Sequence, residues 1–195
     1  MTALLDGSTT SGVQVADGIV VETWASDPML VDPVAFCIDE QGRVYVAETA
    51  RQERGVEDTR TQPYWNLDDI SLQTVEDRLA MYEKWAHRRS DGMNHYTAYE
   101  DRIRRLVDTD GDGRADLQTV FSGGYNDPLD GTGSGVLVHR GDVYYTNIPH
   151  LWRLRDRDDD GVADEREALL SGFGVRIALR GHDMHGLTWG PDGRL

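Results

Sequence analysis

The fold is decided by one stretch, Asp108-Thr109-Asp110-Gly111-Asp112-Gly113-Arg114-Ala115-Asp116, and by its second copy, Asp156-Arg157-Asp158-Asp159-Asp160-Gly161-Val162-Ala163-Asp164. Each copy has carboxylates at alternate positions, a glycine at the sixth position and an Asp at the ninth. Carboxylate oxygens in such a loop can surround a hard cation, and the glycine permits the sharp bend. Both copies therefore predict calcium turns with a structural role.

The predicted calcium ligands occupy the odd positions of each turn, and the second copy adds a Glu at the twelfth position, where the first copy has Thr119. The predicted set is Asp108, Asp110, Asp112, Arg114, Asp116, Asp156, Asp158, Asp160, Val162, Asp164 and Glu167. An EF-hand loop joins two helices, but the residues on both sides of these turns resemble strands. A calcium-bound turn between strands therefore fits better than an EF-hand calcium sensor. A solvated Asp-rich turn without metal is the other alternative.

The chain repeats itself around these turns. Arg105-Leu106-Val107-Asp108 aligns with Arg153-Leu154-Arg155-Asp156, and Val120-Phe121-Ser122-Gly123 aligns with Leu169-Leu170-Ser171-Gly172. Short strands at such a period are typical of propeller blades. The sequence predicts an all-β fold, a partial β-propeller with about three blades of an expected six. Because a ring needs about four to eight blades, we expect the sequence to be the N-terminal part of a longer protein.

The domain organisation follows from this repeat. Residues 1–16 form a flexible lead, and residues 17–195 form the incomplete propeller domain, which begins with a predicted strand over residues 19–24. Residues 51–99 form an insertion of loop and helix. Apolar residues at steps of three and four predict a helix over about 71–89, capped by Ser71 and stapled by Ile70 and Val75.

Charge and composition argue against a nucleic-acid partner and show which common sequence motifs are missing. The formal net charge is −15, from 20 basic and 35 acidic residues, which argues against a nucleic-acid partner. Cys37 is the only cysteine, so the chain has neither an internal disulfide nor a Cys-x-x-Cys-His haem motif. The N-terminal residues show no signal peptide, and no run of residues is apolar and long enough for a membrane span.

A second stretch with chemical potential is Gly181-His182-Asp183-Met184-His185-Gly186. Two histidines and an Asp just before a predicted strand could supply a general base or a metal site. The alternative is that these residues only form hydrogen bonds within the loop. A zinc site is weakly indicated, because no third ligand and no helix to align the histidines are evident.

His182 and the following run Gly186 to Leu195 resemble the His-x-x-Gly-x-Leu-x-Phe-Gly-Pro-Asp-Gly-x-Leu segment of soluble glucose and sorbosone dehydrogenases. Those enzymes are six-bladed propellers that use pyrroloquinoline quinone (PQQ). The resemblance implies that His182 is the catalytic base that takes the proton of a sugar hydroxyl. The spacing around His185 and Gly186 departs from the usual pattern of that family.

A closer resemblance covers nearly the whole chain. Asp32 to Phe36, Gly42 to Glu48, Asp101 to Arg104, Asp127 to Gly133 and Asn147 to Leu154 resemble the membrane-bound dehydrogenase-type propellers of planctomycete-like bacteria. Such proteins often continue into a cytochrome domain that binds haem c. The resemblance also implies a periplasmic, secreted or membrane-associated location.

Together the resemblances imply a calcium-stabilised, quinone-dependent oxidoreductase. Its substrate would be a small sugar or alcohol, and its electrons would pass to a haem-binding cytochrome domain outside this chain. The residues that hold the quinone lie in later blades of that family, so none is assigned here. The alternative from a different class is a non-enzymatic propeller, stiffened by calcium, that binds a protein or a carbohydrate.

Overall fold

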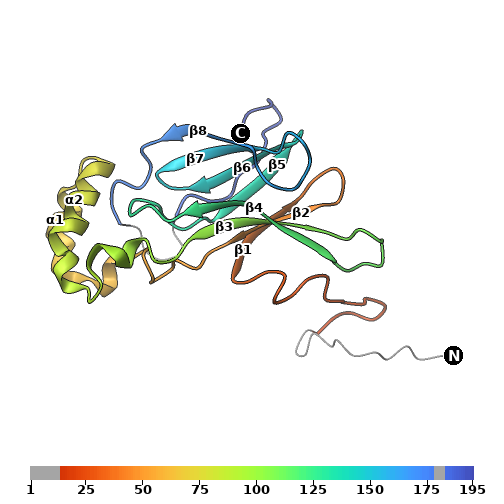
Figure 1. The fold of residues 1–195 in the computed structure, drawn as a ribbon, viewed down its shortest axis with the longest axis horizontal. Helices are drawn as coiled ribbons and strands as arrows, with labels where there is room; N and C mark the ends of the chain where they lie inside the picture. Colours follow the sequence, from red (N-terminus) through yellow and green to blue (C-terminus); the bar gives the residue numbers. More distant parts are fainter. Residues whose placement is uncertain (1–13, 178–182) are drawn as a thin grey trace.

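Two four-stranded antiparallel sheets make up most of the chain (Figure 1), as seen in a computed structural model that describes residues 14–177 and 183–195. The first sheet has the order β1 (Pro33–Ile38), β2 (Val44–Glu48), β3 (Asp101–Val107) and β4 (Leu117–Tyr125). The second has the order β5 (Gly135–His139), β6 (Asp142–Asn147), β7 (His150–Arg155) and β8 (Glu165–Ser171). In both sheets, each strand pairs with the next one along the chain, which confirms the all-β prediction.

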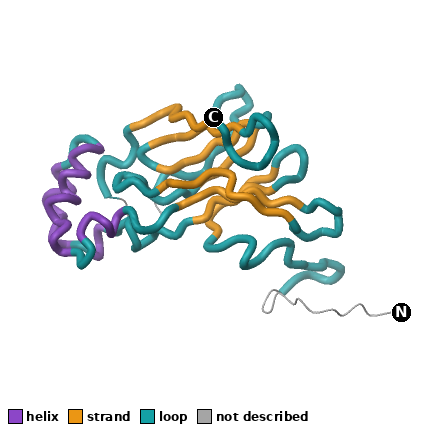
Figure 2. The backbone as a smooth tube through the Cα atoms, in the orientation of Figure 1, coloured by secondary structure: helices purple, strands orange, loops and turns teal. Residues whose placement is uncertain are grey.

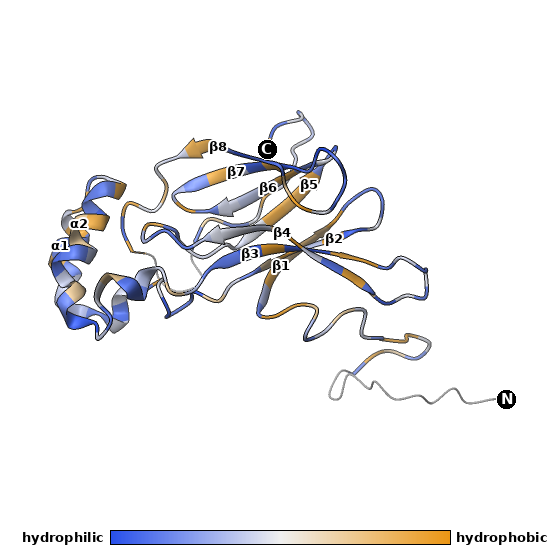
Figure 3. Ribbon diagram, in the orientation of Figure 1, coloured by the Kyte–Doolittle hydropathy of each residue, from blue (hydrophilic) through white to orange (hydrophobic). Residues whose placement is uncertain are grey.

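One hydrophobic core lies between the two sheets. Alternate residues of β2 and β3 face the second sheet, so Tyr45, Ala47 and Ile103 are buried against residues such as Tyr145 and Leu154. Apolar residues are concentrated along β1, β2 and β5 (Figure 3). The sheets are therefore successive layers joined through side chains, and residues 126–134 connect β4 of the first sheet to β5 of the second.

The connection between β2 and β3 holds the helices, at one end of the sheets (Figure 2). The α-helices are α1 (Asn66–Ser71) and α2 (Val75–Trp85). Four short 3-10 helices accompany them: η1 (Thr59–Thr61), η2 (Pro63–Trp65), η3 (Ala86–Arg88) and η4 (Gly92–Tyr96). A second core forms around the buried rings of Trp65, Tyr82 and Tyr96, and Ile177 joins it from the segment after β8. The insertion is thus a small packed unit of its own.

The predicted single helix over about 71–89 is wrong in its bounds. Ser71 ends α1, and Leu72 is extended, with φ −61° and ψ 136°. The cap of α2 is Thr74, whose hydroxyl accepts from the Asp77 N–H, while the Asp77 carboxylate accepts from the Thr74 N–H. This reciprocal capping box starts the helix at Val75. Ile70 is 60% exposed, so the predicted staple does not form.

The predicted strand over residues 19–24 is also absent. Those residues have no regular secondary structure, and Ile19, Val20 and Val21 are exposed. A strand requires a partner edge, and none of the eight described strands pairs with this segment. One of its few backbone hydrogen bonds joins it to the first Asp turn, where the Ala115 N–H donates to the Trp24 carbonyl at 2.9 Å.

The strand order separates two kinds of loop. Because neighbouring strands are antiparallel, the hairpin turns after β1, β3, β5 and β7 all lie at one end of the sheets, and both Asp turns are among them. The helical insertion and the loops after β4, β6 and β8 lie at the other end (Figure 1). Among the described residues, no helix has the length and apolar character needed to span a bilayer.

Candidate functional site

In the first Asp turn, between β3 and β4, the structure brings three predicted ligands together. One carboxylate oxygen from each of Asp108, Asp110 and Asp112 lies within 4.8 Å of the others. Asp108, at the first position, also accepts from the N–H groups of Gly111 at 2.7 Å and Gly113 at 2.9 Å. These two bonds fold the backbone around the carboxylate.

The second turn, between β7 and β8, has the same internal geometry. Asp156 accepts from the N–H groups of Asp159 at 2.7 Å and Gly161 at 2.8 Å, the fourth and sixth positions as before. Here the carboxylates that lie within 4.8 Å of one another are those of Asp156, Asp158 and Asp164. Since β7 and β8 are strands, the EF-hand alternative is wrong.

The other predicted ligands lie outside these two groups. Asp116 accepts from the Thr109 hydroxyl at 2.6 Å, which lowers the pKa of the Asp116 carboxyl. The N–H groups of Arg114 and Val162 donate to the Asp112 and Asp160 carboxylates, each at 2.8 Å. Glu167 lies within β8 and pairs with Arg153 instead of joining the carboxylates of the turn. The prediction that placed Glu167 at the twelfth ligand position is therefore not supported by its contacts.

The second turn is anchored on the first sheet. The Arg105 guanidinium lies 3.3 Å from an Asp156 oxygen and 3.4 Å from an Asp159 oxygen. The Thr119 hydroxyl donates to the Gly161 carbonyl at 2.6 Å. By contrast, no ion pair among the described residues involves Asp108, Asp110 or Asp112. The first turn therefore carries more uncompensated negative charge than the second.

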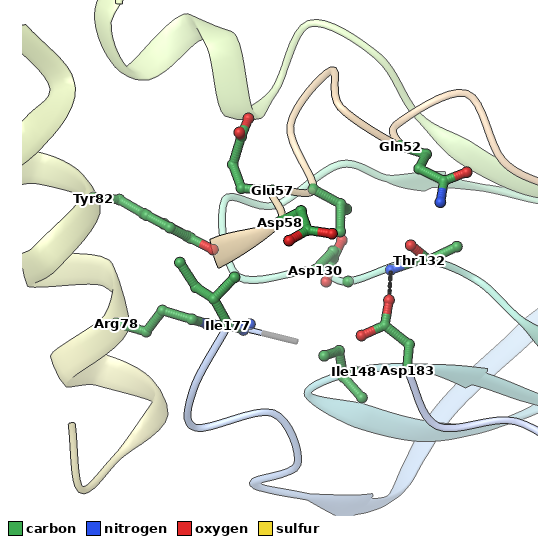
Figure 4. A pocket seen from close by; sticks show the side chains of 12 residues that line it. Gln52, Glu57, Asp58, Arg78, Tyr82, Asp130, Thr132, Ile148, Ile177 and Asp183 are labelled. Carbon is green, nitrogen blue, oxygen red and sulfur yellow. Dashed lines mark hydrogen bonds between the residues drawn. The ribbon is translucent and has the colours of Figure 1, made fainter. Parts of the chain in front are cut away.

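A small cavity with both polar and apolar lining residues lies at the opposite end of the sheets, where the insertion meets the loops after β4, β6 and β8 (Figure 4). Gln52 and Asp58 line it from the insertion, and Asp130 and Thr132 from the loop after β4. Its volume is about 20 Å³, the scale of one water molecule. Asp183 also lines it, and its carboxylate accepts from the Thr132 N–H at 3.1 Å.

Buried charges hold the loops around this cavity in place. The guanidinium of the fully buried Arg51 donates to the backbone carbonyls of Asp130 at 2.9 Å, Tyr96 at 2.8 Å and Asp127 at 2.9 Å. Asp101 is also fully buried, and it accepts from the Thr49 hydroxyl and from the N–H of Gly133, each at 2.9 Å. These contacts fix the start of the insertion and the loop after β4 to β3.

Asp130 is the titratable group that this cavity perturbs most clearly. Its residue is 8% exposed, and burial raises the pKa of its carboxyl to about 6. The Asp127 N–H donates to this carboxyl at 2.9 Å and partly offsets the effect of burial. A carboxyl that titrates near neutral pH can take or give a proton in a reaction. Sequence reasoning did not single out Asp130, Asp101 or Arg51, because an isolated Asp or Arg gives no sign of burial.

The predicted base His182 lies outside the described residues. Asp183, which follows it in the sequence, reaches the cavity, whereas His185 is exposed.

Comparison with known proteins gives one finding. Residues 7–195 match a family described as a domain of unknown function, DUF7133. The chain belongs to this family. Searches of curated proteins and of solved structures found no match to this chain.

The donor atoms of this DUF7133 chain fit one of the expected cofactors and do not fit another. Calcium takes oxygen ligands, mostly carboxylates and carbonyls, and each Asp turn offers three carboxylate oxygens in close reach. A tricyclic quinone does not fit a cavity of about 20 Å³. The described residues around this cavity therefore do not hold the quinone.

Proposed function

We propose that this chain is the calcium-stabilised part of a β-propeller that acts as a sugar or alcohol dehydrogenase. The observation that carries the proposal is the division of the sheets into two ends. The repeated Asp turns lie at one end, and the small cavity that Asp183 lines lies at the other. The proposed metal sites would thus lie apart from Asp183, which follows the proposed base His182 in the sequence.

The propeller is supported by the pairing of the strands. Val44 pairs with Leu106 in the first sheet, and Val143 pairs with Leu154 in the second, so the sheets repeat residue by residue. Each sheet is a meander of four strands, the unit from which propeller blades are built.

In the proposed reaction His182 takes the proton from a substrate hydroxyl, as its resemblance to the sugar dehydrogenases implies. Asp183 and Thr132 fix the loop on the C-terminal side of His182 through their 3.1 Å hydrogen bond. The resemblance implies a quinone as hydride acceptor, which residues outside this cavity would hold, and a haem domain outside this chain would receive the electrons. We place this activity outside the cytoplasm, where calcium is abundant enough for weak turns to fill.

The test is reduction of a redox dye by the complete protein, supplied with quinone, calcium and a panel of sugars and alcohols. We expect His182→Gln to lower kcat by about 10²–10⁴-fold, the usual contribution of a general base. The matched control is His185→Gln, in the same loop, which should retain activity. If no substrate reduces the dye and His182→Gln changes nothing, the protein is a non-enzymatic binding platform.

A further inference from the structure

The outer face of the first sheet, defined here as Phe36, Ile38, Val44, Val46 and Leu106, is apolar and only partly covered. Phe36 is 67% exposed and Ile38 is 60% exposed, although both lie in a strand. The face forms one side of a groove of about 850 Å³, whose other side is the segment from Glu22 to Leu30. An apolar patch of this kind marks an interaction surface.

The second sheet shows what covers this face. Strand pairing makes Phe36 equivalent to Val136, because each pairs with the matching residue of the next strand, Val46 or Tyr145. By the same pairing, Ile38 is equivalent to Val138, since they pair with Val44 and Val143. Leu106 is likewise equivalent to Leu154.

In the second sheet these equivalent residues form the core against the first sheet. Val136 is 7% exposed, Tyr145 and Leu154 are fully buried, and Val138 packs against them. The face that stays open on the first sheet is thus the face that the second sheet buries. The contact between the two sheets therefore has a matching, unfilled half on the far side of the first sheet.

A backbone hydrogen bond identifies one strand of the absent neighbour. In the second Asp turn, the N–H of Ala163 at the eighth position donates to the Phe121 carbonyl at 2.8 Å, and Phe121 belongs to β4, the last strand of the first sheet. In the first turn, the N–H of Ala115 at the same position donates to the Trp24 carbonyl at 2.9 Å. Trp24 therefore occupies the position that Phe121 of β4 occupies one repeat later.

We propose that residues 19–24 are the last strand of a further four-stranded sheet of this repeat, which packs on the outer face of the first sheet. The other three strands come from the same polypeptide, outside residues 1–195. This inference rests on the propeller part of the proposed function and is independent of the dehydrogenase activity. It also explains why Ile19-Val20-Val21-Glu22-Thr23-Trp24 has the composition of a strand and yet has no strand partner among the described residues.

The contact between the two described sheets favours this occupant over a second copy of the chain. Both described sheets already have four strands, so neither lacks a last strand that residues 19–24 could supply. The two sheets belong to one polypeptide and pack through the same residues that the further sheet would use. The new contact continues an interface that the chain already makes.

Hydrogen exchange in the complete protein tests the proposal. We expect amides on alternate residues of Val20 to Trp24 to exchange at least 100-fold more slowly than in a free peptide, and amides of β4 should show the same protection. Exchange at the rate of a free peptide would overturn the proposal. Protection that appears only as the protein concentration rises would also overturn it, because it would identify a second copy as the partner.

Two matched variants test the docking face. Phe36→Asp should raise exchange at residues 20–24 at least tenfold, whereas Leu67→Asp, an equally apolar and even more exposed position at 84% on α1, should leave it unchanged. Equal effects of the two variants would contradict the proposed docking. Dye reduction by the same samples separates the two proposals, since protected strands with no activity would refute only the dehydrogenase.

Discussion

Gly113 and Gly161 occupy the same position of the two Asp turns and have nearly the same backbone, with φ +89° and +92°. Their surroundings differ. A Cβ at Gly113 would meet nothing within 4 Å, whereas a Cβ at Gly161 would lie 2.8 Å from the Arg105 Cζ and from the Thr119 Oγ1. The difference arises because only the second turn is anchored on the first sheet.

Alanine at the two positions should therefore have unequal effects. Gly113→Ala should lower the free energy of unfolding by about 1 kcal/mol, because the left-handed backbone conformation is unfavourable for alanine and no neighbouring atom has to move. Gly161→Ala should lose about 1–3 kcal/mol more, because Arg105 and Thr119 must move. Urea denaturation of both variants measures the difference. Equal losses would mean that the second turn is not held against the first sheet.

The raised pKa of the Asp130 carboxyl predicts that the stability of the protein depends on pH. This pKa is raised to about 6 in the folded state, so the contribution of this carboxyl to stability is complete below about pH 4 and is lost as the pH rises through 6. Asp130→Asn should thus stabilise the protein above pH 6, by on the order of 2 kcal/mol, and have little effect near pH 4. The measurement is the unfolding free energy against pH, with Asp91→Asn, an exposed Asp away from Asp130, as control. A difference that does not depend on pH would refute the assignment.

At the scale of elements, the start of α2 shows where sequence patterns mislead. Ser71 and Thr74 are both good cap residues, and the apolar spacing fits either start. Asp77 decides between them, because only Thr74 lies three residues before an acidic side chain that can return a bond to the cap. The capping box of Thr74 and Asp77 can be recognised in the sequence. The apolar spacing also includes the buried Leu72, however, so the helical pattern continues across the break between α1 and α2.

The two candidate caps can be separated by experiment. Thr74→Ala should cost about 1 kcal/mol of stability, since it removes the acceptor of the Asp77 N–H. Ser71→Ala should cost less than about 0.5 kcal/mol, because Ser71 is exposed and only donates to the Asp68 carbonyl. Thermal unfolding of both variants gives the comparison. A larger loss of stability for Ser71→Ala than for Thr74→Ala would instead support the longer helix capped by Ser71.

At the scale of the whole molecule, the repeat was the most predictable feature. The Asp turns and their flanking residues recur in the sequence, so the strands on both sides of each turn could be predicted from the pattern, although about three blades were expected and the described residues form two sheets. The buried contacts of Arg51, Asp101 and Asp130 did not, because they join residues from the insertion, β3 and the loop after β4. No local pattern records such distant partners.

The strand predicted over residues 19–24 does not form among the described residues, for a related reason. Its residues favour a strand, but a strand exists only where a partner edge is present. The composition of a segment shows its preference for the strand conformation, but it does not show whether a neighbouring strand is available to pair with it.

Calorimetric titration of the metal-free protein with calcium tests the central claim, that the Asp turns are metal sites that stabilise the repeat. We expect two calcium ions for this segment of chain, with dissociation constants on the order of 10⁻⁴ to 10⁻³ M. The variant with Asp110→Asn and Asp158→Asn together should bind neither ion, whereas Glu167→Gln should bind both, because Glu167 pairs with Arg153. A folded protein that takes up no calcium, or a double variant that binds as well as the natural sequence, would contradict the account.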